Sequence, residues 1–600
     1  MVQSSFQQLL ATPQCFLECY PHEGGSYSIP ASNFPVGGGQ GQILSLTVRK
    51  FMKEAAGSFV ITLAPGGPNG ANAPPSWIDI ITPMSFVMIG MARGQYSNLV
   101  MCGVVTSAAE SWSFPSSPGE RVMRTITIMG YDFGYFFTHF SWYALTFLNV
   151  NGAGLSAALG GGNAGALGTI QNYGGGLTQG SPDAIGAAWF QNVMDGGNGI
   201  LSRTWVQDGS NNPLPFSQAV QVQFEKYITS ADTPFSFTYV NAEENWYDKF
   251  NKIFPYPFYE FFIMTAPSNF YGTALSTRWN QVNTGSAFAM KKLGYQNPAQ
   301  INIIARVNPL PYIVPNITGG GSTGANPGPN DGPGGNSGAG DGSAGGTGYT
   351  LGNINVTAWN NLTLFQEDTS LIRTTEEFSE EEVRNFYLIN PTYQTTMLGQ
   401  SNNASTPPTL ALQAAVDPAS VHRYGFRPAY IETEWLSDPS GQIAQTGQLN
   451  IEELLATMTC QLSSQYEPTP LMMRAVRQGA LRPDIIPGNK FQYQPLKGPD
   501  LGPWLFYIEG VEHEYVFGGK STTKLTLSRG LPANVYANTS LLTQIHLGNA
   551  QRLNSQYQQG LPQGPNQTPE KPLEVVNLLD PNIQQVLADI APIYSTPGQR

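Results

Sequence analysis

Charged residues are scarce in this chain. Asp, Glu, Lys and Arg make up only 12% of its 600 residues, whereas aromatic residues make up 11%. Charged residues usually account for about a quarter of a soluble protein. Because subunit interfaces are rich in aromatic residues and poor in Lys and Glu, this composition predicts that other subunits cover much of the surface. An extracellular β-rich protein shares this composition and remains an alternative.

The chain also lacks an excess of basic residues. Its 29 Lys and Arg stand against 41 Asp and Glu, which gives a formal net charge of −12. A protein that grips nucleic acid neutralises phosphates with clustered Lys and Arg, so this balance argues against such a role. It does not argue against a channel, because an acidic lumen would let DNA pass without sticking.

Cysteine is rare as well, with only Cys15, Cys19, Cys102 and Cys460. Four scattered residues are too few for a disulfide framework, so we expect free, mostly buried thiols. Pairing of Cys15 with Cys19, or a metal held by them and a His, is the weaker alternative, and we expect no cofactor. The chain has no secretory signal at its start and no run of 18 apolar residues, so we expect no membrane-spanning segment and assembly in a cytoplasm.

Catalytic motifs are missing too. The sequence has no Gly-x-Ser-x-Gly, His-Glu-x-x-His or Cys-x-x-Cys, and its five histidines stand alone. His513 shares a strand face with Val511 and Tyr515, which favours a satisfied core or interface histidine. Glu512 and Glu514 lie on the opposite face. A glycosidase uses two carboxylates in a cleft, but a surface pair is the simpler interpretation, so we expect no enzyme.

What the chain does contain is a repeated strand–turn–strand pattern near its two ends. The copies are Leu99–Val105 with Arg124–Gly130, and Phe506–His513 with Thr523–Gly530. The first strand of each copy holds a Gly-Val pair, at Gly103 and Gly510, where the missing side chain permits a β-bulge. The second strand alternates apolar with small polar residues and ends at Gly. The repeat predicts two copies of one small β-barrel.

Four further stretches follow the order of a known family. They are Trp77–Ile89 with its Pro-Met turn, Gly119–Asp132, the Pro-Phe-x-Glu strand of Tyr256–Phe262, and the Arg-Pro-x-x-x-Pro-Gly turn of Arg482–Gly488. Together with the repeat they resemble the phage tail baseplate hub, a family shared with contractile injection systems and the type VI secretion spike hub. The resemblance covers roughly residues 40–535 and depends on the order of the motifs, since none is specific alone.

The resemblance implies a structural virion protein at the tail tip or baseplate, assembled in the host cytoplasm. A homotrimer would form a ring whose two barrels per chain match the sixfold tail tube protein, while its threefold symmetry suits a spike or needle protein. Tape measure protein and then DNA would pass through the lumen, and other baseplate proteins would bind outside. Alternatives are the hub of a type VI secretion or tailocin-like contractile device, and a secreted β-rich carbohydrate-active enzyme or adhesin.

The predicted fold class is mainly β with α+β elements: two small β-barrels of tail-hub type, an intervening mixed α/β domain, a helical insertion and an extended C-terminal tail. The predicted boundaries are 1–40 for an N-terminal arm, 41–150 for the first hub barrel, 151–315 for the mixed domain with a Gly-rich insertion, 316–350 for a flexible Gly-rich loop, 351–480 for second-half entry strands and the helical insertion, 481–535 for the closing hairpin of the second barrel, and 536–600 for a C-terminal linker and docking helix.

Apolar spacing predicts the local elements. For the first barrel we expect strands at 44–48, 57–63, 77–89, 99–105 and 121–129. Between the barrels we expect a helix within 243–254, a strand at 256–264, an acidic helix capped by Ser379 with Glu382 at its third position, and a helix after Asn450.

Two segments have unusual composition. Residues 319–348 contain 14 Gly and no aliphatic residue larger than Ala, so they cannot offset their ordering entropy by burial and should be flexible. Asp331 and Asp341 invite a calcium-repeat interpretation, but the nine-residue period is missing. Residues 152–180 are also Gly-rich, without a phosphate-binding motif.

The C-terminal region carries the candidate interaction residues. Residues 552–572 are rich in Gln, Pro and Gly and should form a linker. A short helix is expected from Asp580-Pro581 to Ala591. Its aliphatic face consists of Ile583, Val586, Leu587 and Ile590. Because so short a helix is marginal alone, we expect it to dock on a partner, with folding back onto its own barrel as the alternative.

Overall fold

The computed structural model describes a set of segments between residues 12 and 542. They are 12–21, 27–31, 43–65, 76–94, 96–114, 123–139, 141–142, 178–180, 182–190, 220–227, 235–238, 244–265, 301–317, 349–368, 370–391, 414–416, 418–433, 435–436, 458, 461–462, 465–466, 472–496, 502–538 and 542.

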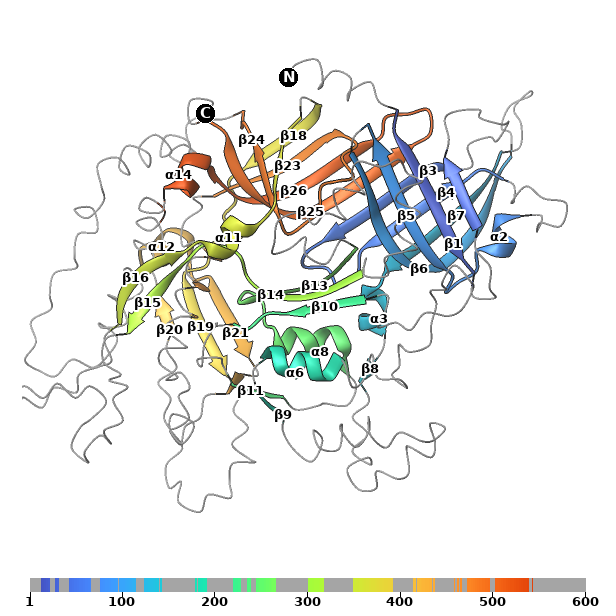
Figure 1. The fold of residues 1–600 in the computed structure, drawn as a ribbon. Helices are drawn as coiled ribbons and strands as arrows, with labels where there is room; N and C mark the ends of the chain where they lie inside the picture. Colours follow the sequence, from blue (N-terminus) through green and yellow to red (C-terminus); the bar gives the residue numbers. More distant parts are fainter. Residues whose placement is uncertain are drawn as a thin grey trace, which may run out of the picture.

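A single sheet of 13 strands runs through both halves of the chain (Figure 1), with the main order β18-β23-β26-β25-β3-β4-β7-β6-β5-β1-β2. Its N-terminal strands are β1 (Gln14–Tyr20), β2 (Tyr27–Ala31), β3 (Ile43–Phe51), β4 (Ser58–Leu63), β5 (Phe86–Arg93), β6 (Tyr96–Ser113) and β7 (Met123–Asp132). Its C-terminal strands are β17 (Leu364–Gln366), β18 (Leu371–Glu377), β23 (Met473–Ala480), β24 (Lys490–Tyr493), β25 (Trp504–Val516) and β26 (Thr522–Pro532). The predicted fold class, mainly β with α+β elements, is confirmed.

The seven N-terminal strands curl around one core, because β2 returns to lie beside β3. Alternation along each strand explains the inward face. In β4, Phe59, Ile61 and Leu63 are buried, whereas Val60 between them is exposed. The inward-facing residues of the other six strands pack with these three side chains in a single apolar cluster. We call these seven strands the first barrel.

The expected strand at 77–89 is wrong in its first part. Trp77–Ile80 form a short helix, α2, and the strand begins only at Phe86. Pro83 has no N–H to donate to a ladder, and the next residue, Met84, has a positive φ of 69°, so the chain cannot stay extended here. The helical turn instead places Trp77 and Ile80 together in the core of the first barrel.

The C-terminal strands form a second curved set, which we call the second barrel. β24 pairs antiparallel with β25 and parallel with β17, and β18 pairs with β23 at the other side. Trp504, Phe506 and Ile508 of β25 point into its core. The second barrel continues directly into the first, because β25 pairs antiparallel with β3 over Gly510–Val516.

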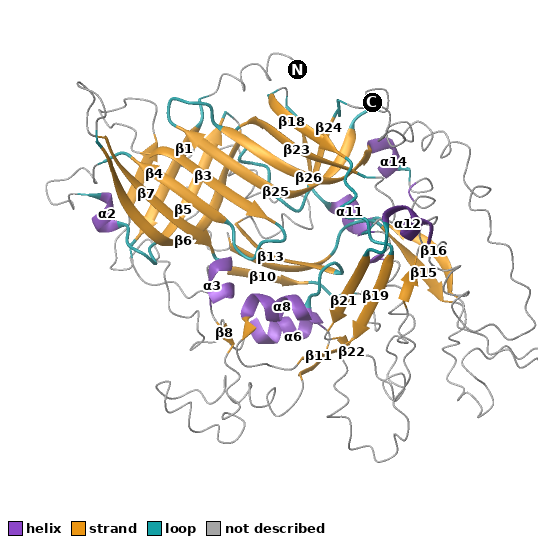
Figure 2. Cartoon of the chain, turned by 180° about the vertical axis from the view of Figure 1, so that it is seen from behind, coloured by secondary structure: helices purple, strands orange, loops and turns teal. Residues whose placement is uncertain are grey.

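A mixed layer lies against the second barrel and contains β10 (Val220–Phe224), β13 (Tyr259–Thr265), β14 (Ile301–Val307), α3 (Gly134–His139), α6 (Pro182–Trp189) and α8 (Trp246–Ile253). β10 and β14 are parallel, and β13 is antiparallel to β14. Alternate residues of β13 lie in two different hydrophobic cores. Phe262 faces the second barrel, whereas Phe261 packs on Phe250 of α8. Figure 2 shows α6 and α8 beneath this small sheet.

The predicted helix within 243–254 is confirmed as α8. It begins where the Asn245 side chain accepts a hydrogen bond of 2.8 Å from the backbone N–H of Asp248, a typical N-cap. Trp246, Phe250 and Ile253 form its buried face. The predicted strand at 256–264 is observed from Tyr259 onward as β13.

Smaller elements complete the described part of the chain. They are β8 (Ser141–Trp142), β9 (Thr178–Gly180), β11 (Phe235–Thr238), β12 (Glu244–Asn245), β15 (Tyr312–Ile317), β16 (Tyr349–Asn355), β19 (Phe386–Pro391), β20 (Ala414–Val416), β21 (Pro428–Thr433), β22 (Trp435–Leu436), α11 (Thr357–Asn361), α12 (Pro418–Tyr424) and α14 (Ala533–Ala537). The short sheets are β8-β12, β9-β11-β22, β15-β16 and β20-β19-β21.

The acidic helix expected after Ser379 is not formed. The Ser379 hydroxyl accepts from the N–H of Glu381 at 3.2 Å, which closes a turn, and no helix follows. Successive acids pair in different directions, Glu380 with Arg427 and Glu382 with Arg474, and these contacts hold the segment in turns. Of the helix expected after Asn450, the structure describes only the residues at 458, 461–462 and 465, which are helical and buried.

The Gly-rich segment 319–348 lies outside the described residues, but the strands on both sides of it pair. Ile317 of β15 is opposite Tyr349 of β16, so the two ends of the segment are adjacent. We therefore expect that replacing residues 319–347 with Asn-Gly changes the melting temperature by no more than about 2 °C, since shortening a loop with fixed ends costs little. Thermal unfolding measures the effect. A much larger loss of stability would show that the segment packs against the rest of the chain.

Candidate interaction surface and the junction of the barrels

The junction between the barrels is the β3–β25 ladder. Gly510 lies opposite Phe51, and a side chain at this glycine would come within 2.3 Å of the Phe51 ring. Glycine fits here because the Phe51 ring occupies the space that a side chain would need. In the C-terminal copy of the repeat, a register shift between Ile508 and Gly510 marks the expected bulge. In the N-terminal copy the shift lies between Val105 and Ser107, just after the Gly103-Val104 pair.

The junction creates an unbroken outer face across both barrels. One cross-strand row consists of Gln478, Lys524, Glu512, Arg49, Ser58 and Tyr131. Charges alternate along this row, with Lys524 Nζ 3.5 Å from Glu512 Oε2. The neighbouring row ends in Val60 and Met129, each about two-fifths exposed. This face is mainly polar, with an apolar end on the first barrel.

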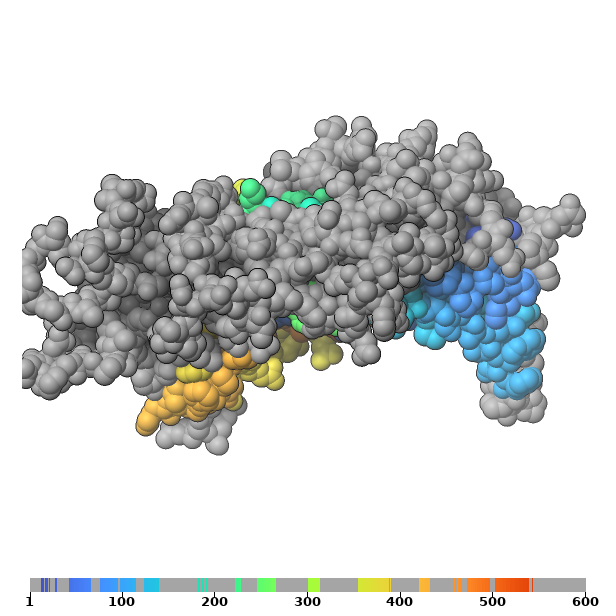
Figure 3. Space-filling model, turned by 90° about the horizontal axis from the view of Figure 1, so that it is seen from below, coloured from blue at the N-terminus to red at the C-terminus, as the bar shows by residue number. Residues whose placement is uncertain are grey.

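The β6–β7 hairpin extends beyond the first barrel as an arm. β5 pairs with β6 only as far as Val104, whereas β7 pairs with it up to Ser113. Near the end of the arm the Arg124 guanidinium lies 5.0 Å from the centre of the Trp112 ring, and Trp112 and Phe114 are 55% and 74% exposed. Seen from below in Figure 3, part of the first barrel, in blue, projects from one end of the molecule. Exposed aromatic side chains on a projecting hairpin are typical of a contact surface.

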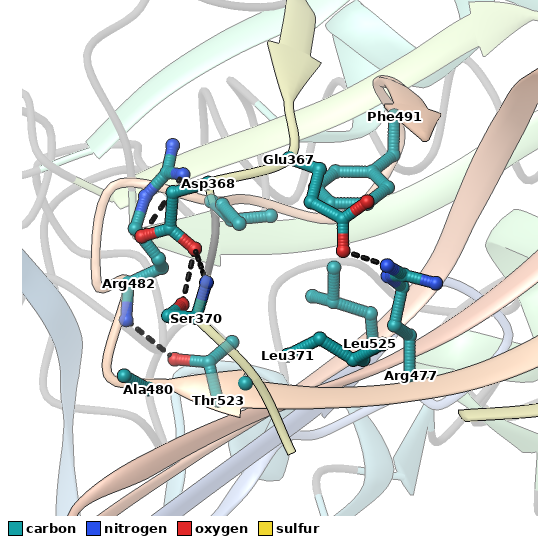
Figure 4. A pocket seen from close by; sticks show the side chains of 12 residues that line it. Glu367, Asp368, Ser370, Leu371, Arg477, Ala480, Arg482, Phe491, Thr523 and Leu525 are labelled. Atoms are coloured by element: carbon teal, nitrogen blue, oxygen red, sulfur yellow. Dashed lines mark hydrogen bonds and ion pairs between the residues drawn. The ribbon is translucent and has the colours of Figure 1, made fainter. Parts of the chain in front are cut away.

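A cluster of charged residues joins the two barrels, and Figure 4 shows the part of it around Arg482, Asp368, Glu367 and Arg477. Arg482 donates two hydrogen bonds to the carboxylate of Asp484, at 2.9 and 2.7 Å. Asp368 lies 3.9 Å from Arg482 and 3.8 Å from Arg93 of the first barrel. Arg93 also donates to the carbonyl of Leu481 at 3.3 Å. The predicted Arg-Pro-x-x-x-Pro-Gly turn thus supplies a bridge between the barrels.

The cavity at this cluster is small. Its volume is about 30 Å³, which is about the room that one water molecule needs. Arg477 and Glu367 form an ion pair on one side of it, and Thr523 accepts from the N–H of Arg482 at 2.8 Å on the other (Figure 4). Burial lowers the pKa of Arg477 to about 10. We interpret the cluster as a fixed inter-barrel contact, because the cavity is too small for a ligand.

A second buried network links the mixed layer to the second barrel. Arg306 of β14 donates to Glu260 of β13 at 2.9 and 2.7 Å, and Tyr507 of β25 donates to the same carboxylate at 2.5 Å. Arg306 also donates to the carbonyl of Gly488 at 2.8 Å. Burial and then the nearby Glu260 carboxylate raise the pKa of the Tyr507 hydroxyl well above its usual value. Tyr507 is therefore a hydrogen-bond donor at neutral pH.

The candidate residues from the sequence fall into two groups. Ile583, Val586, Leu587 and Ile590 lie outside the described residues, as does Cys460. Cys15, Cys19 and Cys102 are free and buried, as expected, and burial raises the pKa of the Cys19 and Cys102 thiols to about 12. Within the described segments no group of three or more metal-binding side chains occurs, and no helix there is long and apolar enough to cross a membrane.

The expectation for His513 is confirmed. It is 5% exposed, and its Nδ1 lies 2.9 Å from the hydroxyl of Thr523. Sequence reasoning did not find the Arg306–Glu260 network. The signal was a single charge inside each of two apolar strands, Tyr259–Thr265 and Ile301–Val307, in a chain with few charges.

Comparisons with known proteins find structural likeness at very low sequence identity. No protein-family model matches the chain, and no curated protein matches it. The chain is similar to a tail protein from Neisseria meningitidis MC58, with a TM-score of 0.38, 9% identity and coverage of 86% of this chain and 96% of that one. It is also similar to the 43 kDa tail protein of prophage MuSo2 from Shewanella oneidensis, with a TM-score of 0.38, 9% identity and coverage of 86% and 98%. An E. coli component of the type VI secretion system has a TM-score of 0.34, 7% identity and coverage of 82% and 73%.

Proposed function

We propose that this chain is a structural, non-catalytic hub subunit of a phage-type tail, and that three copies form a ring. One observation carries the proposal: two barrels that each contain a long antiparallel hairpin, β6–β7 and β25–β26, join into one sheet through β3 and β25. A short helix follows each hairpin, α3 after β7 and α14 after β26. A chain with two similar halves gives six similar faces in a trimer, which matches a threefold ring to a sixfold partner.

In this proposal the ring connects the sixfold tail tube to a threefold spike or needle at the tail tip or baseplate. Tape measure protein and then DNA pass through its lumen, and other baseplate proteins bind its outer surface. The net charge of −12 suits such a channel, because clustered basic residues would hold DNA. Assembly takes place in the host cytoplasm.

A reconstruction of the tail tip without imposed symmetry tests this role. We expect three copies of the chain in one ring, with both barrels of each copy contacting the tube. Six copies in a ring, or no copies at the junction with the tube, would overturn the proposal. A monomer in dilute solution would not, since the ring can require the tube as a template.

The helix predicted at the C-terminal end gives a separate prediction. We propose that its aliphatic face docks on a baseplate partner, so Leu587→Asp with Ile590→Asp should abolish partner recruitment while the melting temperature of the isolated chain stays unchanged. Co-purification of tail assemblies and thermal unfolding measure the two effects. Gln585→Asp with Ala588→Asp, on the opposite face, is the control and should recruit normally. A large loss of stability in the first variant would show instead that the helix packs on its own barrel.

A further inference from the structure

A cleft of about 300 Å³ lies where the first barrel, the mixed layer and the second barrel meet. Tyr247 of α8 and Tyr256, which precedes β13, contribute to its walls, and Phe261 and Leu310 add apolar surface. Clefts at the junction of several structural units are frequent binding sites. This one is about ten times larger than the cavity at the inter-barrel cluster.

Charges of both signs line the cleft. Lys53, which follows β3, is half exposed and lies over the Tyr256 ring at 5.2 Å, while its ammonium group is 3.9 Å from Glu509. Arg529 of β26 is buried beside them with a positive φ of 59°. The hydroxyl of Tyr536 donates to its carbonyl at 2.7 Å and helps to hold this costly conformation. The cleft therefore offers aromatic surface together with cations and a carboxylate.

The described part of the chain ends beside this cleft. Leu542 is fully buried and belongs to the same apolar cluster as Leu310, which lines the cleft. Tyr507 belongs to the same cluster and also lines the cleft, so the last described residue and the cleft share two core residues. As a flexible chain, the stretch from Leu542 to Pro569 reaches roughly 30 Å, which is more than enough to return to the cleft.

That segment contains two Pro-x-x-Pro sequences, Pro562–Pro565 and Pro569–Pro572. Such sequences favour the extended polyproline II helix and bind grooves lined by aromatic side chains. The second sequence encloses one acid and one base, Glu570 and Lys571. Their charges complement Lys53 and Glu509 of the cleft, whereas the first sequence encloses only Gln and Gly.

We propose that the cleft binds residues Pro569–Pro572 of the chain's own C-terminal segment as a polyproline II helix. The prolines pack on Tyr247 and Tyr256, Glu570 pairs with Lys53, and Lys571 pairs with Glu509. The inference does not depend on the proposed role in a tail. It has a structural consequence for the predicted helix, because a clamp at Pro572 would hold Asp580 within roughly 15 Å of the cleft.

Disulfide trapping in the full chain tests the clamp. With Asn251→Cys in the cleft and Thr568→Cys in the segment, mild oxidation should give an intramolecular cross-link. The control pair, Lys520→Cys with Thr568→Cys, places the first thiol on the exposed turn between β25 and β26. We expect the cleft pair to cross-link at least about tenfold faster than the control, since binding raises the effective concentration of the second thiol. Non-reducing electrophoresis and peptide mass spectrometry measure both rates.

Three outcomes would overturn the proposal. They are equal rates for the two pairs, a cross-linked dimer in place of a cross-linked monomer, and an unchanged rate after Pro569→Ala with Pro572→Ala. A charge exchange adds a test that loss of folding cannot imitate. Lys53→Glu should slow the cross-link, and adding Glu570→Lys should restore its rate, while failure of this rescue would also contradict the assigned pairing. Pro562→Ala with Pro565→Ala is the matched control and should leave the rate unchanged.

Discussion

Replacing Arg306 with Met is expected to lower the free energy of unfolding by about 3–5 kcal/mol, because it leaves a buried carboxylate without its cation. Glu260 is only 8% exposed and accepts two hydrogen bonds from Arg306. Loss of Arg306 also removes a donor from the carbonyl of Gly488, so the contact between the mixed layer and the second barrel should weaken. Chemical unfolding followed by fluorescence measures the change.

The double variant Arg306→Met with Glu260→Leu should recover a large part of this loss, because it removes the Glu260 carboxylate that the single variant leaves without its cation. Lys524→Met is the exposed control. Lys524 lies 3.5 Å from Glu512 with 47% of its side chain exposed, and such surface pairs contribute about 0–1 kcal/mol. If Arg306→Met and Lys524→Met had the same small effect, the buried network would not stabilise the junction.

Local alternation made β3, β4, β6, β7 and the β25–β26 hairpin predictable. Residues such as Phe59, Ile61 and Leu63 alternate with polar or exposed neighbours, and they form the inner face of the first barrel. The wrong predictions, a strand at 77–85 and a helix after Ser379, come from effects that a pattern of alternating residues does not reveal. Pro83 interrupts a continuous apolar run, and the acids after Ser379 form ion pairs with Arg427 and Arg474 in place of a helix.

The joining of the barrels could not be predicted from the sequence. β3 and β25 are far apart in the chain, and neither strand has a pattern that specifies the other as its neighbour. The pairing depends on tertiary details such as Phe51 over Gly510. The same holds for Arg482, whose turn was predicted but whose contact with Asp368 near Arg93 joins residues from three distant segments.

Lowering the pH from 7.5 to 5 is expected to destabilise the protein partly through His513, by about 2 kcal/mol. Burial lowers the pKa of His513 from its usual 6.5 to about 3. Between these two values the unfolded chain binds a proton at this position that the folded chain does not bind. The contribution of the neutral His513 to the free energy of unfolding is therefore fully present above pH 6.5. It decreases as the pH falls through 6.5, and below about pH 3 it no longer changes.

The structure explains why the folded state excludes this proton. The Thr523 hydroxyl accepts from the N–H of Arg482 and can donate to Nδ1 of a neutral His513 ring, an arrangement that a proton on Nδ1 would disrupt. Urea unfolding at pH 7.5 and pH 5 should show that His513→Gln loses less stability on acidification than the unmodified chain, by about 2 kcal/mol. The exposed His422→Gln variant should match the unmodified chain at both pH values. An identical pH response of all three proteins would mean that His513 is protonated equally in the folded and unfolded states.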